Sequence, residues 1–336
     1  MATTGSVRLH TGQRMPTVGL GTWMLTDGEA LKAAIDVGYR HIDTAQYYQN
    51  EDRIGEVLEQ QIKDGKIMRE EMFITTKLTP MGMAPEHVRK ETEKSLKRLK
   101  TSYIDLYLIH FPVAHSDELL EKGVATPLYK DGTPKTVFID PLDTWREMEK
   151  LVDDGLVKAI GLSNFSLKQV ERIYSLARIK PANLQMEIHA WFPQYDFVDF
   201  CTKRGISITA YAPIGSPGKP EMPGLGPSGK ALLEEPALKE VASKHGKTPA
   251  HVLLRNLIQR GIIVIPKSSN PERIRLNFEV FDFELTDEDM DVIKGLNKEK
   301  RLFTFGAVGE RNFHHPFFPF PEIKDSCDFQ DVNKDL

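Results

Sequence analysis

Residues 95–112 read SLKRLKTSYIDLYLIHFP, and this stretch sets the pattern from which the whole fold is predicted. Its central part, Ile104–Ile109, has the sequence IDLYLI, which is almost entirely apolar. A strand that is buried on both faces has this composition, whereas a half-solvated strand alternates apolar and polar residues. The residues before it, Pro85–Leu99, show a helical pattern. The stretch therefore predicts a helix that leads into a buried, parallel strand.

The same alternation of short β-rich runs and helical patterns continues through the chain. Strands are expected at Val18–Leu20, Arg40–Asp43, Phe73–Leu78, Ile104–Ile109, Val157–Gly161, Asn183–Ile188, Ile206–Ala210 and Ile262–Ile265. Helices are expected near Thr26–Gly38, Asn50–Lys63, Pro85–Leu99, Leu142–Asp153, Asp196–Arg204, Pro236–His245, Pro249–Arg260 and Pro271–Asn277, and one begins at about Ser166. Thr26 and Glu29 have the spacing of a capping box. Eight strand–helix units predict parallel strands, and an α/β (β/α)8 TIM barrel is their simplest closed packing.

No segment indicates a second domain. Ser6–Met15 predicts a β-hairpin added at the N-terminus, and the end of the chain lacks periodicity. We expect a single domain over residues 1–336, with a core at about 7–320 and an extended C-terminal tail at about 299–336. A chain of this length buries a large core without disulfides or metals.

The alternative architecture is a doubly wound open sheet, which wants a glycine-rich phosphate turn after its first strand. Val18–Gly21 holds two glycines, but Met24 stands where the third should fall. Residues 224–229 match the spacing GxGxxG, yet no strand precedes them and Pro227 lies inside the match. A flexible loop accounts better for that glycine pattern, so the barrel is favoured.

The composition gives no sign of a nucleic-acid-binding, secreted or membrane protein. The formal net charge is −4, so no basic surplus points to nucleic acid or to an anionic membrane. The two cysteines form no CxxC unit, and the N-terminus lacks the apolar segment of a signal peptide. No run of about 18 apolar residues could span a bilayer. We therefore expect a cytoplasmic protein with no nucleic-acid or membrane partner.

Polar residues at the ends of neighbouring strands predict an active site, because the active sites of parallel barrels lie there. Asp43 ends the second expected strand, Lys77 lies near the end of the third, and His110 follows the fourth. Tyr48 lies five residues beyond Asp43. A tyrosine with a pKa of about 10 is a weak acid, and a nearby ammonium lowers that value. We expect Lys77 to supply this charge, Asp43 to hold the amine, and His110 to orient a carbonyl oxygen.

Each of these residues has an ordinary structural interpretation when it is considered alone. Asp43 could cap a turn, Tyr48 could be a surface aromatic, Lys77 could form a structural ion pair, and His110 could be a satisfied loop histidine. Their coincidence at successive strand ends makes four such explanations together much less probable.

Three long motifs resemble the aldo-keto reductase family, in its aldose and aldehyde reductase-like branch. They are Gly38–Ala45 with Tyr48 and Asn50-Glu51, then Ser95–Pro112, and finally Ile265–Ser268 with Arg273, Ile274 and Asn277. The resemblance implies NADPH-dependent reduction of aldehydes or ketones to alcohols in a monomer. It assigns Tyr48 as proton donor, Asp43 and Lys77 as its activators, and His110 as the group that orients the carbonyl.

The resemblance also implies a nicotinamide cofactor that lies across the barrel mouth. The implied cofactor-binding residues are Thr22, Trp23, Asp43, Ser163, Asn164, Gln185, Tyr211, Ala212, Ser216, Lys267, Ser268, Arg273 and Asn277. Among them, Tyr211 matches the residue that stacks on the nicotinamide ring. Lys267, Ser268 and Arg273 match the positions for the 2′-phosphate, which implies NADPH over NADH; a solvated basic helix start is the alternative. Leu276 and Ala212 depart from the family's more usual acidic residue and serine.

Substrate specificity is expected in the long loops. His110, Trp23, Tyr47 and Phe111 are candidate substrate contacts, and Phe111 and Thr79 stand where the family often carries tryptophan. The phenylalanines of the tail either line an apolar pocket or dock the tail on the barrel. They are Phe303, Phe305, Phe313, Phe317 and Phe318. The glycine-rich loop Gly215–Gly229 resembles the flap that covers the cofactor pyrophosphate.

The sequence leaves two other functions open. Lys77 could form a Schiff base as in an aldolase, although Tyr48 and the anion site fit that chemistry less naturally. A non-catalytic, NADPH-binding barrel of crystallin-like or channel-associated type is a further alternative. No metal site is expected, because Glu187-x-His189 and His314-His315 lack a convincing third ligand. The natural carbonyl substrate stays open.

Overall fold

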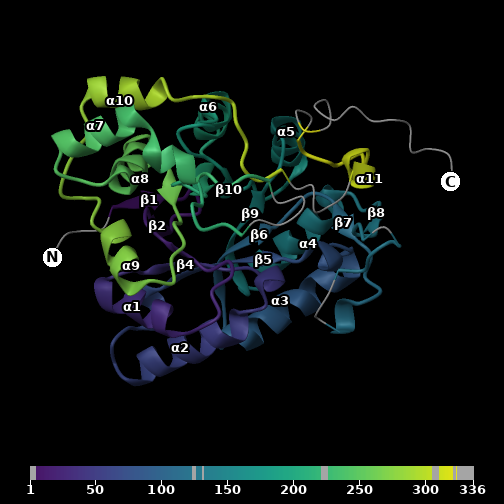
Figure 1. Ribbon diagram of the computed structural model, residues 1–336. Coiled ribbons are helices and arrows are strands. Elements are labelled where there is room, and N and C mark those ends of the chain that lie inside the picture. Colours follow the sequence, from purple (N-terminus) through teal and green to yellow (C-terminus); the bar gives the residue numbers. More distant parts are fainter. Residues whose placement is uncertain are drawn as a thin grey trace.

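The computed structural model describes residues 5–122, 126–130, 132–220, 226–304, 310–320 and 323 (Figure 1). Eight parallel strands lie side by side in chain order: β3 (Leu20–Gly21), β4 (His41–Asp43), β5 (Phe73–Leu78), β6 (Ile104–Ile109), β9 (Val157–Ser163), β10 (Asn183–Glu187), β11 (Ser207–Tyr211) and β12 (Ile263–Val264). The first and last strands also meet, because Val18 pairs with Val264 and Gly19 N donates to Val264 O at 2.9 Å. The sheet is therefore closed, and the predicted (β/α)8 barrel is confirmed.

Helices surround the strands (Figure 1). They are α1 (Glu29–Val37), α2 (Glu51–Lys63), α3 (Pro85–Leu99), α4 (Pro141–Asp153), α5 (Leu167–Leu176), α6 (Tyr195–Thr202), α7 (Pro236–Lys244), α8 (Pro249–Gln259), α9 (Pro271–Phe278), α10 (Asp287–Lys294) and α11 (Glu310–Phe313). Several begin at side-chain caps; Ser166, for example, caps α5 in a capping box with Gln169. The capping box expected at Thr26 is wrong. The helix begins at Glu29, and the Asp27 carboxylate accepts from the backbone N–H groups of Glu29 and Ala30.

The predicted N-terminal hairpin closes one end of the barrel. It consists of β1 (Ser6–Arg8) and β2 (Arg14–Pro16). Leu9 and Met15 are buried in a cluster with apolar side chains of the barrel: Phe73, Leu106, Leu108, Ala159, Ala182 and Ile263. Phe73 and Ile263 are the first residues of β5 and β12. Burial of this layer keeps water out of the barrel at the end that the hairpin covers. An active site can therefore form only at the opposite end, where the strands have their carboxyl ends.

Long connections cover that opposite end. After β6 the chain forms an antiparallel ribbon of β7 (Ala114–His115) and β8 (Thr136–Val137). The tail helix α11 lies beside this ribbon (Figure 1), and Thr136 Oγ1 donates to Asn312 Oδ1 at 2.9 Å. Within the described residues, no helix is long and apolar enough to cross a membrane. The ribbon and the tail together form the rim above the strand ends.

Truncation of the hairpin core should destabilise the barrel. Leu9 is only 2% exposed, and we expect Leu9→Ala to lower the free energy of unfolding by about 2–5 kcal/mol, since it leaves a cavity. Leu176→Ala is the matched control, because Leu176 is 60% exposed, and it should change the value by less than about 0.5 kcal/mol. Urea unfolding measures both variants. Equal effects would contradict the sealing role of the hairpin.

Candidate active site

The strand-end residues predicted from the sequence lie together in the structure. Asp43 is the last residue of β4, and Lys77 lies next to the end of β5. Lys77 Nζ donates to Asp43 Oδ1 at 2.6 Å and to the backbone oxygen of Thr44 at 2.8 Å. It also lies 3.4 Å from the phenol oxygen of Tyr48, which comes from the short helix η1 (Gln46–Tyr48). The ammonium group thus bridges a carboxylate and a phenol within the protein interior.

His110 faces the same phenol. The ring centroids of Tyr48 and His110 are 5.5 Å apart, with the rings almost perpendicular. His110 Nδ1 is buried and has no hydrogen-bond partner among the described residues. Both side chains line a cavity of about 290 Å³ at the carboxyl ends of the strands. A group bound in this cavity therefore meets a phenol and an imidazole at once.

Burial and charge set the protonation of these groups. Burial would lower the pKa of Lys77, but the attraction of Asp43 and Tyr48 raises it overall, so the amine stays charged. Burial raises the pKa of Tyr48, and the opposing effect of Lys77 does not reverse this. Lys77 thus acts on the pKa of Tyr48 in the expected direction, but burial has the larger effect, which the sequence did not predict. Burial, aided by Lys77, holds the pKa of His110 well below its usual range, so the imidazole is neutral at pH 7.

Amide and hydroxyl groups form the floor of the cavity. Gln185 Nε2 donates to the second oxygen of Asp43, Oδ2, at 2.6 Å, so both carboxylate oxygens of Asp43 are engaged. Asn164 has a left-handed backbone (φ 62°), and its amide donates to His110 O at 3.0 Å and to Ser163 Oγ at 3.1 Å. Tyr211 OH donates to Asn164 Oδ1 at 2.8 Å. These bonds fix the ring of Tyr211 beside the tetrad, the name used from here on for Asp43, Tyr48, Lys77 and His110.

Most of the site residues predicted from the sequence line this one cavity. They are Thr22, Trp23, Asp43, Tyr47, Tyr48, His110, Phe111, Ser163, Asn164, Gln185, Tyr211, Ala212, Ser216 and Lys267. Lys77 is completely buried behind Tyr48. Ser268, Arg273 and Asn277 are outside the cavity lining. They belong to the segment that leads from Lys267 into α9.

The segment after β12 carries two neighbouring cations. Lys267 and Arg273 are exposed, and neither forms an ion pair with a described carboxylate. Neighbouring protein atoms that displace part of the water around its amine, together with the nearby charge of Arg273, lower the pKa of Lys267. Arg273 Nε lies 3.4 Å from Ser268 Oγ. Two adjacent cations beside a hydroxyl at a helix start fit an anionic group such as a phosphate. Asn277, in contrast, is buried on α9.

Some phenylalanines of the tail line the cavity, and others dock the tail on the barrel. Phe303 lines the cavity, with its ring 5.9 Å from Trp23 and 5.5 Å from Tyr211. Phe313, Phe317 and Phe318 instead pack in a cluster around Phe111, which docks the tail on the rim; the cluster also holds Val113, Phe320 and Ile323. Phe305 lies outside the described residues.

A buried carboxylate that the sequence analysis did not assign holds Phe303 in place. Glu187, at the end of β10, accepts from Leu302 N and Phe303 N and bonds to His189 Nε2 at 2.9 Å. Lys219 donates to Leu302 O and lies over the ring of Phe303. Among the described residues no group of three potential metal ligands occurs. Glu187 thus fixes the backbone of the tail at Leu302 and Phe303. The local sequence pattern did not indicate that Glu187 binds the backbone of Leu302 and Phe303, which lie more than 100 residues further along the chain.

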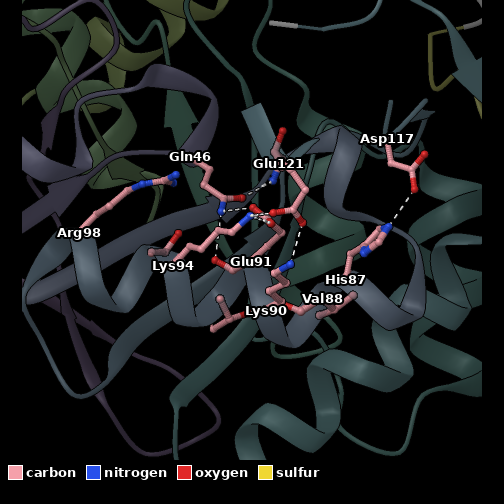
Figure 2. Close-up of polar contacts among 12 residues, drawn as sticks. Gln46, His87, Val88, Lys90, Glu91, Lys94, Arg98, Asp117 and Glu121 are labelled. Carbon is pink, nitrogen blue, oxygen red and sulfur yellow. Dashed lines mark hydrogen bonds and ion pairs between the residues drawn. The ribbon is translucent and has the colours of Figure 1, made fainter. Parts of the chain in front are cut away.

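Gln46 is a second residue that the sequence analysis missed, and it connects the Tyr48 segment to α3 (Figure 2). Its amide nitrogen donates to Glu91 Oε2 at 2.8 Å and to Glu91 O at 3.0 Å, while its oxygen accepts from Thr79 N at 3.1 Å. Lys94 binds Glu91 at 2.7 Å and lies 3.7 Å from Glu121. Helix α3 is thus a common anchor for η1, the end of β5 and the loop after β7.

Comparison with known proteins agrees with this architecture. A family model described as the aldo/keto reductase family matches residues 17–298. Aldo-keto reductase family 1 member A1-A of Danio rerio is 44% identical over 330 residues, which cover 95% of this chain and 99% of that protein. The member A1 protein of Gallus gallus is 43% identical, with 94% and 97% covered. The structure of the aldose reductase from Schistosoma japonicum superposes with a TM-score of 0.84 at 42% identity and covers 95% of this chain and 99% of that one.

Removal of the Gln46 amide should weaken the Tyr48 segment. We expect Gln46→Ala to lower the free energy of unfolding by about 1–3 kcal/mol, because Thr79 N and the buried Glu91 each lose a partner. Gln60→Ala is the matched control, since Gln60 is an exposed glutamine whose side chain donates to the exposed Asp64. Urea unfolding compares the two. If both variants unfold like the unmodified chain, Gln46 does not anchor η1.

Proposed function

The chain belongs to the aldo/keto reductase family, and from this premise we propose that it reduces small aldehydes and ketones to alcohols with NADPH. Family membership makes it an oxidoreductase of carbonyl compounds, and the family generally uses a nicotinamide cofactor. The observation that carries the finer proposal is the buried contact of Lys77 with Asp43 and Tyr48 beside His110.

The four residues have distinct tasks in this proposal. NADPH, when bound, supplies the hydride that reduces the carbonyl carbon. Tyr48, whose raised pKa keeps the phenol protonated, donates its proton to the carbonyl oxygen as negative charge develops there. Lys77 stabilises the tyrosinate that forms. This stabilisation is stronger in the transition state than in the ground state, because the negative charge on Tyr48 develops there. Neutral His110 donates a hydrogen bond to the same oxygen.

Residues for the cofactor are available on both sides of the tetrad. Tyr211 would stack on the nicotinamide ring, and Ser163, Asn164 and Gln185 would contact its carboxamide. Thr22, Trp23, Ala212 and Ser216 line the cavity between this floor and Lys267. Lys267, Ser268 and Arg273 would bind the 2′-phosphate, and Asn277 would contact the adenine. The two unpaired cations support the choice of NADPH over NADH.

The alternative functions fit the site less well. A Schiff-base lysine must be neutral to attack a carbonyl, whereas the raised pKa of Lys77 keeps its amine charged. A non-catalytic, cofactor-binding barrel would not need the contact between Lys77 and Tyr48. A single domain over 1–336, a monomeric state and a cytoplasmic location stay predictions from the sequence.

Loss of the phenol should abolish proton donation without harming cofactor binding. We expect Tyr48→Phe to lower kcat by about 10²–10⁴-fold with an aromatic aldehyde, while the Kd for NADPH stays within about twofold of the original. Tyr47→Phe is the matched control, because Tyr47 lines the same cavity but does not touch Lys77. NADPH oxidation is followed by absorbance. Turnover by Tyr48→Phe equal to that of the control would refute the proton-donor role.

Cofactor preference should depend on Arg273. We expect Arg273→Ala to raise the Kd for NADPH by about tenfold or more and to leave the Kd for NADH unchanged, because only NADPH carries the 2′-phosphate. Arg275→Ala is the control, since Arg275 is already paired with Glu272 and Glu279. Fluorescence titration with each cofactor measures the constants. An equal loss for NADH would contradict the assignment.

A further inference from the structure

His115 is an imidazole in the wall of the same cavity that neither the tetrad nor the cofactor contacts use. It ends β7 and pairs with Thr136 of β8, so it belongs to an ordered ribbon on the rim. Successive side chains of a strand point to opposite faces. Ala114 packs into the barrel core, and His115 is therefore directed away from that core. Its side chain is 5% exposed.

Both ring nitrogens of His115 are buried without a hydrogen-bond partner among the described residues. A buried polar group in this state is unfavourable, and such groups in native proteins are nearly always paired with protein, water or ligand. Burial lowers the pKa of His115 to about 4, and the nearby His315 acts in the same direction. The ring is therefore neutral, with one N–H donor and one acceptor nitrogen.

The rest of this wall offers few other polar groups. Apolar residues that line the same cavity include Pro80, Phe111 and Pro134. The ring nitrogens themselves are shielded, so the part of His115 that reaches the cavity is not a nitrogen. A half-turn about the Cβ–Cγ bond exchanges Nδ1 with Cδ2 and Nε2 with Cε1 and leaves the plane of the ring unchanged. The subsite proposed below uses the ring in this second orientation, which needs no shift of the backbone.

We propose that His115 forms a second polar subsite, which binds a hydroxyl group of the carbonyl substrate at a position remote from the carbonyl. The proposal rests on the proposed carbonyl reduction, and it extends that function to hydroxyl-bearing aldehydes and ketones. His115 is a specificity-determining residue in this role, because it touches the substrate but not the reacting atoms.

The donor and acceptor pattern favours a hydroxyl over a carboxylate. A hydroxyl both donates and accepts, so it can pair with whichever nitrogen of a neutral imidazole faces it, the N–H or the acceptor nitrogen. A carboxylate only accepts, so it can pair with the N–H alone, and the neutral ring that burial maintains supplies no charge to offset the loss of its hydration. An apolar group would leave the facing nitrogen unpaired and would lose affinity for that reason.

The test compares matched aldehydes in the full chain with NADPH. The pairs are 3- and 4-(hydroxymethyl)benzaldehyde against 3- and 4-methylbenzaldehyde, with 3- and 4-carboxybenzaldehyde as the anionic members. We expect His115→Phe to lower the ratio of kcat/KM for the hydroxymethyl over the methyl compound by about tenfold. His115→Gln keeps a donor and an acceptor and should retain most of the ratio. The methyl compound is the internal reference in each variant, so a change that affects all substrates alike cancels in the ratio.

Other outcomes separate the subsite from the reaction. An unchanged ratio for both isomers in His115→Phe overturns the subsite, and so does a loss confined to the carboxylate compounds. If no aldehyde is reduced, the proposed function fails, and calorimetry then tests the subsite by itself. The probes are 3-(hydroxymethyl)benzyl alcohol and 3-methylbenzyl alcohol, each titrated into the chain saturated with NADP⁺. Weaker binding of the hydroxymethyl compound alone in His115→Phe supports the subsite, and equal binding overturns it.

Discussion

The buried ion pair between Lys77 and Asp43 is the constraint on which the rest of the site depends. Removal of two charges from water is costly, and the pair persists only if its remaining hydrogen-bonding groups are satisfied. Lys77 also donates to Thr44 O, and the second oxygen of Asp43 accepts from Gln185. These partners come from β4, β5 and β10, which are distant in the chain. The pair is therefore complete only when the barrel is closed.

Closure of the barrel depends on apolar burial at both of its ends. The N-terminal hairpin seals the amino ends of the strands with Leu9 and Met15. At the carboxyl ends the tail packs on Phe111, while Glu187 holds the backbone of Phe303 so that its ring lines the cavity. Asp43 and Lys77 are consequently buried, and electrostatic interactions in the protein interior are stronger than in bulk water. The same burial keeps the Tyr48 phenol protonated and His110 neutral.

The local pattern of the sequence predicted the barrel and the strand-end residues, because each strand and helix carries its own periodicity. Asp43, Lys77 and His110 follow from that pattern, since parallel strands bring their carboxyl ends to one edge. The sequence did not predict the protonation state of Tyr48. The lowering of its pKa by a nearby ammonium was predicted, but the larger, raising effect of burial depends on how the surrounding residues pack. Contacts between segments that are distant in the sequence could not be predicted either. Gln46 with Glu91 and Glu187 with Leu302 join residues whose proximity no local pattern encodes.

The central claim is that this cavity brings a carbonyl carbon to a nicotinamide hydride and its oxygen to Tyr48. Isotope transfer tests this claim directly: the chain is incubated with NADPH that carries two deuterium atoms at C4, and with benzaldehyde in ordinary water. The account predicts benzyl alcohol with one deuterium on its carbinol carbon, detected by mass spectrometry and NMR. Absence of reduced product, or benzyl alcohol without deuterium at that carbon, would contradict it.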